Sequence, residues 1–123
     1  MSERTEHLKA VKTAVIKRAG GLLNSSEAAR RLGVPVSEIQ RRVANGEIIA
    51  VPGAEGGPAL PAVQFEDEAV REALPRILDA MHVTDPWMRL QLLLDRDVIG
   101  AVRLGRPDDA VRAVQSYLAP EDG

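Results

Sequence analysis

The chain has 123 residues, 45% of them apolar and 28% charged, with a net charge of −2 at pH 7. This apolar content excludes a disordered chain, and the length allows one compact domain or two small subdomains that share a core. Cysteine is absent, which excludes disulfides and thiolate metal sites, and the charged N-terminal stretch has no apolar run of signal-peptide or membrane-spanning length. We therefore expect a cytoplasmic protein that does not bind a membrane.

Aromatic residues make up only 2% of the chain, so the core has to be built from Leu, Val, Ile and Ala, whose spacing is mostly helical. The sequence predicts a mainly α fold. Three parts are expected: an N-terminal amphipathic helix within residues 1–21, a helix-turn-helix with a small β-hairpin wing in residues 22–65, and a helical domain in residues 66–123.

The charges are divided unevenly along the chain. Residues 1–50 hold nine Lys/Arg and five Asp/Glu, a net charge of +4, whereas residues 51–123 hold seven and thirteen, a net charge of −6. A basic first half suggests an anionic partner, and an acidic second half suggests a different role. Chance asymmetry on a solvated surface is the alternative explanation.

The N-terminal segment has apolar residues at i, i+3, i+7 and i+8, the spacing of one helical stripe. The residues are Leu8, Val11, Val15 and Ile16. Gly20 and Gly21 end the predicted helix. It could pack on its own subunit or on a second copy, and the sequence leaves both open.

Two short helices joined by a tight turn are predicted in the stretch NSSEAARRLGVPVSEIQRRVA. Ser25 or Asn24 is placed to cap the first helix, which Gly33 ends. Pro35 suits the first turn of a second helix that runs to about Ala44. This pattern is typical of a helix-turn-helix.

The second of these helices has two distinct faces at 100° per residue. The face expected to pack consists of Val36, Ile39 and Val43, and the face free to meet a partner consists of Ser37, Gln40, Arg41 and Ala44. Arg42 follows Glu38 by one turn, so an i, i+4 ion pair is expected to engage it.

A β-hairpin wing is predicted after the second helix, because two short apolar runs flank the loop PGAEGGP. The runs are residues 48–51 and 59–63. Pro58 and Pro61 are expected to confine the return strand to a sheet edge. The loop carries Glu55 but no basic residue that could grip a phosphate.

Helices are expected from residue 66 onward. Asp67 is predicted to cap a short helix through Ala73, with a separate helix beginning at Pro75. Further starts are expected at Asp85-Pro86, Asp97 and Asp108. In the helix expected to begin at Asp85-Pro86, apolar residues at i, i+3 and i+7 form a stripe: Trp87, Leu90 and Leu94. Core packing is the default for this stripe, and an exposed partner-binding role is the alternative.

No catalytic or metal-binding motif is present. His7 and His82 have no metal-site spacing, and the chain lacks a nucleophile elbow, a phosphate loop and a dinucleotide fingerprint. The acidic residues at 66–68, 95 and 97 fall at predicted helix starts, where carboxylates satisfy free N–H groups. We expect neither an enzyme nor a cofactor.

Two stretches resemble known families. Residues 22–51, LLNSSEAARRLGVPVSEIQRRVANGEIIAV, are similar to the DNA-binding unit of MerR and excisionase-type proteins. From PAVQF onward, the segments LPRILDAM, DPW and LGRPDDAVRAVQSYL resemble the C-terminal toxin-binding domain of the Xre/MbcA/ParS antitoxin family. The second resemblance implies an operator-binding N-terminal part and a helical part that blocks a partner toxin of the RES type, which attacks NAD.

The resemblance implies base contacts from Ser37, Gln40 and Arg41. It implies phosphate contacts from Arg30 and Arg31, to which Lys17 and Arg18 could add. A monomer with so few contacts would bind weakly, so a homodimer on a two-fold DNA site is expected.

The leading hypothesis is thus a DNA-binding transcriptional regulator, the antitoxin of a type II pair that represses its operon. A protein-interaction adaptor whose helix-turn-helix no longer binds DNA is the alternative, favoured by the acidic net charge, the wing without basic residues and Pro35 at a usual Ser/Thr cap position. A small-ligand-sensing regulator is a third possibility, although only Phe65, Trp87 and Tyr117 could provide aromatic walls.

Overall fold

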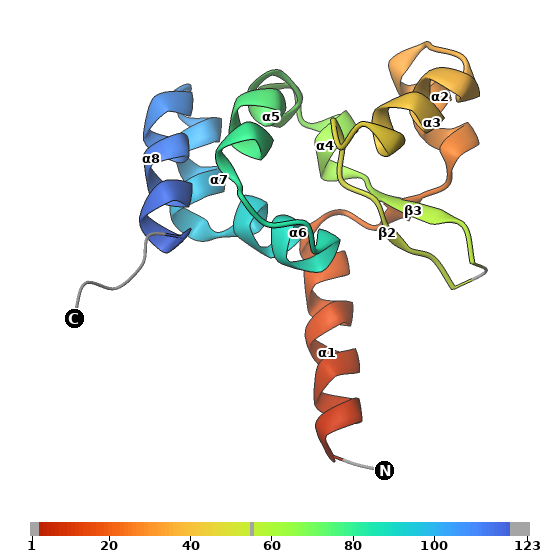
Figure 1. The fold of residues 1–123 in the computed structure, drawn as a ribbon, viewed down its shortest axis with the longest axis horizontal. Helices are drawn as coiled ribbons and strands as arrows, with labels where there is room; N and C mark the ends of the chain where they lie inside the picture. The colour runs from red at the N-terminus through yellow and green to blue at the C-terminus, as the bar shows by residue number, and fades with distance from the viewer. Residues whose placement is uncertain (1–2, 55, 119–123) are drawn as a thin grey trace.

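The computed structural model describes residues 3–54 and 56–118, with side chains from residue 9 onward (Figure 1). Its first part comprises α1 (Glu3–Arg18), β1 (Leu22–Leu23), α2 (Ser25–Leu32), α3 (Val36–Ala44), β2 (Val51–Pro52) and β3 (Pro58–Pro61). The remainder is helical: α4 (Val63–Glu66), α5 (Glu68–Ala80), α6 (Pro86–Leu94), α7 (Arg96–Arg103) and α8 (Pro107–Leu118). The predicted mainly α fold is confirmed.

The two ends of the molecule are built from different helix groups. Figure 1 shows α2 and α3 at one end and α7 and α8, packed beside α5, at the other. The C-terminal part of α1 packs on α6, and its N-terminal part projects away from the body. One buried apolar cluster nevertheless includes residues from α1, α2, α3 and α5 to α8. The core is therefore continuous across positions 21 and 65.

The polar residues at the helix starts act as caps. The Asn24 side chain accepts a hydrogen bond from the Glu27 backbone N–H at 2.8 Å, and the Glu27 carboxylate accepts one from the Asn24 N–H at 3.0 Å. Of the two predicted candidates, Asn24 is thus the cap, in a capping box. Asp67 and Asp85 cap α5 and α6 as predicted.

The predicted start of α7 is wrong by two residues, because Asp95 is its cap. The Asp95 carboxylate accepts a hydrogen bond from the Asp97 N–H at 2.9 Å. Asp97 lies in the first turn, where its negative charge favours the positive end of the helix.

Pro75 does not begin a helix, as the sequence had predicted, but lies inside α5. A proline there removes one backbone hydrogen bond. The helix continues because Leu74, Ile77 and Leu78 on its inner face are buried, while Pro75 itself is exposed. Tertiary burial therefore overrides the local signal.

The predicted hairpin wing is present, but β3 is not an edge strand. Its antiparallel partners are β2 on one side and β1 on the other, in the order β1-β3-β2. Leu22–Leu23 pairs with the end of β3 and Val51–Pro52 with its beginning. Each ladder is two residues long, so the prolines at the two ends of β3 are compatible with a central position.

A buried glutamine fastens the base of the wing. Gln64 in α4 is 1% exposed, and its amide accepts a hydrogen bond from the Ile49 N–H at 2.8 Å and donates one to the Ile49 carbonyl at 2.7 Å. This side chain therefore satisfies both backbone groups of a buried residue, as a neighbouring strand would.

The predicted stripe of α6 and part of that of α1 face the core, while Ile16 of α1 is half-exposed and is not among the residues packed on the core. Val15 is buried, and Val11 packs against the cluster; the side chain of Leu8 lies outside the described residues. Leu90 and Leu94 are buried, and Trp87 is half-buried with the Lys12 ammonium 5.0 Å from its ring centre. Among the described helices, none is long and apolar enough to cross a bilayer.

Candidate nucleic-acid interface

The turn between α2 and α3 depends on Gly33. This residue adopts a left-handed conformation with φ of 69° and donates its N–H to the Ala29 carbonyl, which ends α2. Pro35 then precedes α3 in an extended conformation without a side-chain cap. Ala28 and Ile39 are fully buried where the two helices pack. The sequence thus forms the predicted helix–turn–helix pair.

The exposure of the α3 side chains largely agrees with the two predicted faces. Ser37, Gln40, Arg41 and Ala44 are all exposed. On the packing face Ile39 is fully buried and Val43 partly so, but Val36 is 37% exposed and lies at the margin. The polar face of α3 is therefore accessible to a partner.

Arg41 is held by two carboxylates on the surface of the helix. Its guanidinium donates to Glu38 at 2.9 and 2.8 Å and to Glu47 at 2.8 Å. These hydrogen bonds from Arg41 lower the pKa of Glu47, and those from Arg41 and Arg42 lower the pKa of Glu38 to about 2. Both acids are consequently ionised at neutral pH.

The predicted ion pair of Arg42 is confirmed, since its Nε donates to Glu38 at 2.9 Å. Glu38 therefore serves two arginines. Together with Glu47 these side chains form what we call the α3 charge cluster, namely Glu38, Arg41, Arg42 and Glu47. Its formal charge is zero, because two cations face two anions.

Glu47 was not singled out by the sequence, although it is the second partner of Arg41. It follows Gly46, whose φ of 71° turns the chain back along the end of α3. Asn45 adds a 3.3 Å hydrogen bond to the same carboxylate. Helical spacing rules cover neighbours three and four residues apart within a helix, and Glu47 lies beyond the helix end.

The four predicted phosphate-binding residues have different environments. Arg30 is exposed beside a shallow hollow at the α2–α3 turn, and Lys17 is exposed in the last turn of α1. Arg31 is paired with Glu66, and the Arg18 guanidinium donates to the carbonyl of Leu94 at the end of α6. Within the described residues, neither Arg30 nor Lys17 has an ion-pair partner.

The four predicted phosphate-binding residues therefore do not form one surface. Arg30 lies in the same two-helix unit as the exposed face of α3. Arg18 instead lines a hollow with Glu66, Asp67 and Glu68, so its immediate surroundings are acidic. Arg18 joins α1 to α6, a structural contact that the sequence did not indicate.

The histidines and acidic side chains of the described residues do not gather into a metal-binding group. No group of three His, Cys, Asp or Glu side chains could hold a metal ion there. The acidic residues Asp67, Asp85 and Asp95 cap helices. His82 is exposed, and the side chain of His7 lies outside the described residues.

Comparisons with models of protein families, with curated proteins and with solved structures found no match to this chain. The functional interpretation therefore depends on the residues and their geometry.

Proposed function

We propose that the chain is a DNA-binding transcriptional regulator that reads a base sequence with α3. The observation that carries this proposal is the exposed face formed by Ser37, Gln40, Arg41 and Ala44 on the second helix of a helix-turn-helix, beside a hairpin wing. In this architecture the second helix enters the major groove. Gln40 suits an adenine edge and Arg41 a guanine edge.

To contact a base, Arg41 has to release its hydrogen bonds to Glu38 and Glu47 and donate to the base instead. Its side chain is half exposed, so the exchange takes place at the solvent boundary, where ion pairs contribute little. Arg30 supplies a phosphate contact next to the helix, and Lys17 could contribute only if the DNA extends toward α1. Because one subunit offers few contacts, the active form is a homodimer on a two-fold site.

The test is selection of bound sequences from random duplex DNA, followed by gel shifts at about 50 and 200 mM salt. We expect one enriched motif whose affinity falls at the higher salt. Replacing Gln40 and Arg41 with alanine should reduce affinity for this motif by at least about tenfold, since each base contact contributes about 1–3 kcal/mol. The unfolding temperature should fall only slightly, because the substitution removes the ion pairs of Arg41 with Glu38 and Glu47, which are exposed; affinities are therefore compared well below the unfolding transition.

The matched control replaces Gln91 and Arg96 with alanine, a glutamine and an arginine that are exposed on α6 and α7. It should bind the motif like the unmodified protein. Motif affinity that survives the α3 double substitution would show that α3 is not the reading helix.

The acidic C-terminal half is proposed to bind and block a toxin, which makes the protein an antitoxin. Only the resemblance of residues 61–118 to the antitoxin family supports this step. Co-expression with the product of an adjacent gene tests it. We expect growth arrest by that product alone, its relief by this chain, and co-elution of the two purified proteins in size-exclusion chromatography.

An adaptor that has lost DNA binding is the second candidate, and the α3 charge cluster favours it. With Arg41 and Arg42 both paired with carboxylates, the cluster presents no net charge to a polyanion. This candidate predicts no enriched motif and no salt-sensitive binding in the same selection. The two functions are therefore separated by one experiment.

A further inference from the structure

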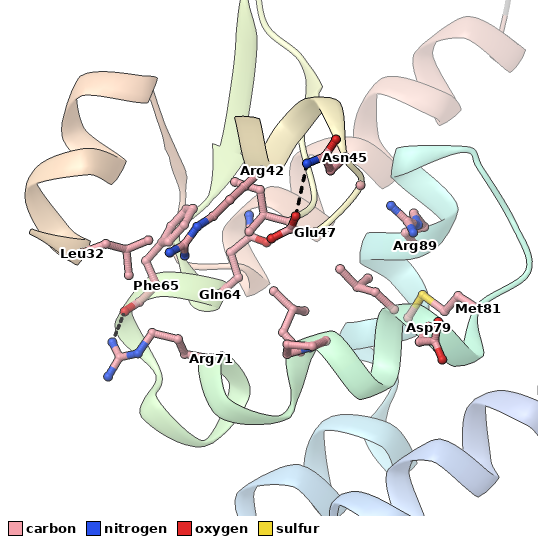
Figure 2. Close-up of a pocket in the computed structure, with 15 residues that line it drawn as sticks. Leu32, Arg42, Asn45, Glu47, Gln64, Phe65, Arg71, Asp79, Met81 and Arg89 are labelled. Carbon is pink, nitrogen blue, oxygen red and sulfur yellow. Dashed lines mark hydrogen bonds between the residues drawn. The ribbon is translucent and has the colours of Figure 1, made fainter. Parts of the chain in front are cut away.

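A pocket of about 470 Å³ lies between the helix-turn-helix and the C-terminal helices. Figure 2 shows Leu32 and Phe65 at one end of it and Arg89 and Met81 at the other, with α5 along one side. Its walls come from the end of α2, the end of α3 and the turn that follows, α4, α5 and α6. The volume lies within the range of small-molecule sites.

Arg89 is the one side chain of the described residues with a buried polar atom that lacks a hydrogen-bond partner, its Nε. No carboxylate of the described part lies within ion-pair distance of its guanidinium. The guanidinium lies beside the turn at Gly46, where an added Cβ would be 3.8 Å from Nη1. Only Nε is buried without a partner, and Arg89 as a whole is half-buried. An anion in the pocket that accepts from the guanidinium would compensate its unpaired charge.

The other arginines at the pocket are already engaged. Arg71 donates to the Phe65 carbonyl at 2.8 Å, and Arg42 to Glu38 at 2.9 Å. This leaves Arg89 as the lining cation for which no protein acceptor is found in the described residues.

The lining also limits the charge of a ligand. Asp79 lines the pocket and has no ion-pair partner among the described residues, so it opposes a second negative charge on a ligand, whereas the other lining carboxylate, Glu47, is paired with Arg41. Apolar side chains form much of the remaining wall, among them Leu74, Leu78 and Met81. The combination suits an apolar body that carries a single negative charge.

We infer that this pocket is a binding site for a small organic monocarboxylate, whose carboxylate accepts hydrogen bonds from Arg89 and whose apolar body rests on α5. The inference concerns this pocket alone and does not depend on DNA binding by α3. The Asp79 carboxylate and the apolar wall distinguish such a ligand from phosphate.

Benzoate is a suitable probe, with benzyl alcohol as the neutral analogue and inorganic phosphate as the dianionic arm. Amide chemical shifts of the full chain are followed by NMR during each titration. We expect saturable benzoate shifts centred on Gly46, Ile48 and Leu78, with a Kd of about 1 mM, as for a fragment of this size. Benzyl alcohol and phosphate should bind at least about tenfold more weakly.

Two substitutions should change benzoate affinity in opposite directions. Arg89→Gln should weaken binding at least about tenfold, because it removes the charged donor. Asp79→Asn should strengthen binding severalfold, because it removes an opposing charge from an exposed position. Arg96→Gln on α7 is the matched control and should leave the affinity unchanged.

The opposite sign for Asp79→Asn keeps the test decisive even if Arg89→Gln impairs folding. Absence of saturable shifts up to about 20 mM benzoate, far above the expected Kd, would overturn the inference. So would unchanged affinity in either pocket variant, or phosphate binding as tight as benzoate. None of these outcomes alters the DNA-binding result, which is measured separately.

Discussion

At the residue scale, the two arginines of α3 share the Glu38 carboxylate, and Arg41 also pairs with Glu47. The Arg42–Glu38 pair follows from i, i+4 spacing and was predictable. The ion pair between Glu47 and Arg41 forms because the chain reverses at Gly46. Helical spacing rules do not predict such a pair. The sequence likewise did not identify Arg89 as a candidate binding residue. Its Nε lacks a hydrogen-bond partner because of how separate elements pack around it.

Glu38 should give the folded state a dependence on acid pH. Its pKa is lowered from 4.5 to about 2 by hydrogen bonds from Arg41 and Arg42, so its stabilising effect is complete above pH 4.5. The effect should disappear as the pH falls through about 2, where the folded-state carboxylate becomes protonated. Glu38→Gln should therefore unfold at lower urea concentration than the unmodified protein at pH 6, and the difference should vanish near pH 2.

Glu72→Gln is the control for this pH series. Glu72 is exposed on α5 and has no ion pair among the described side chains. Its urea midpoint should follow that of the unmodified protein at every pH. A Glu38→Gln difference that stays constant from pH 6 to pH 2 would contradict the assigned pKa.

At the element scale, local signals predicted most helix starts, with Pro75 and Asp97 as exceptions, but they predicted the strand pairings badly. Caps such as Asn24 and Asp85 act on N–H groups within the same turn, so a short window of sequence contains the whole interaction. The central position of β3 requires Leu22–Leu23, which lies far from it in the chain. Pro75 is a case in which burial of the helix face outweighs a local break signal.

Replacing Pro75 with alanine should stabilise the protein by about 1–3 kcal/mol. The substitution restores an N–H donor in the middle of α5 and removes the ring that crowds the preceding turn. Pro86→Ala is the matched control, because Pro86 occupies the first turn of α6, where the N–H has no helical partner. Urea unfolding should show a gain for the first variant and little change or a small loss for the second.

At the scale of the whole molecule, the three predicted segments share one core. The buried cluster extends from α1 to α8, and the contacts of Arg18 with Leu94 and of Lys12 with Trp87 join the first helix to α6. A sequence reveals where composition changes, but it does not show that separate apolar faces meet in a single interior. We therefore expect the described part of the chain to unfold as one cooperative unit.

Trp87→Ala tests this expectation. Trp87 is half-buried, so its loss should cost about 2 kcal/mol, less than the 3–5 kcal/mol typical of a fully buried aromatic residue. Circular dichroism at 222 nm and an amide of α2 observed by NMR should report the same shifted midpoint. A second transition confined to the C-terminal helices would show that the halves unfold independently.

The two hydrogen bonds between Gln64 and Ile49 also determine which part of the wing can change in sequence and length. Because Gln64 bonds both backbone groups of Ile49, the base of the hairpin is joined to α4 as well as through the short ladder between β2 and β3. The loop between these strands lies beyond that attachment, so a change in its length should leave α3 in place. Under the proposed function, the wing tip is the segment in which basic residues could be added, and DNA affinity raised, at little risk to the fold.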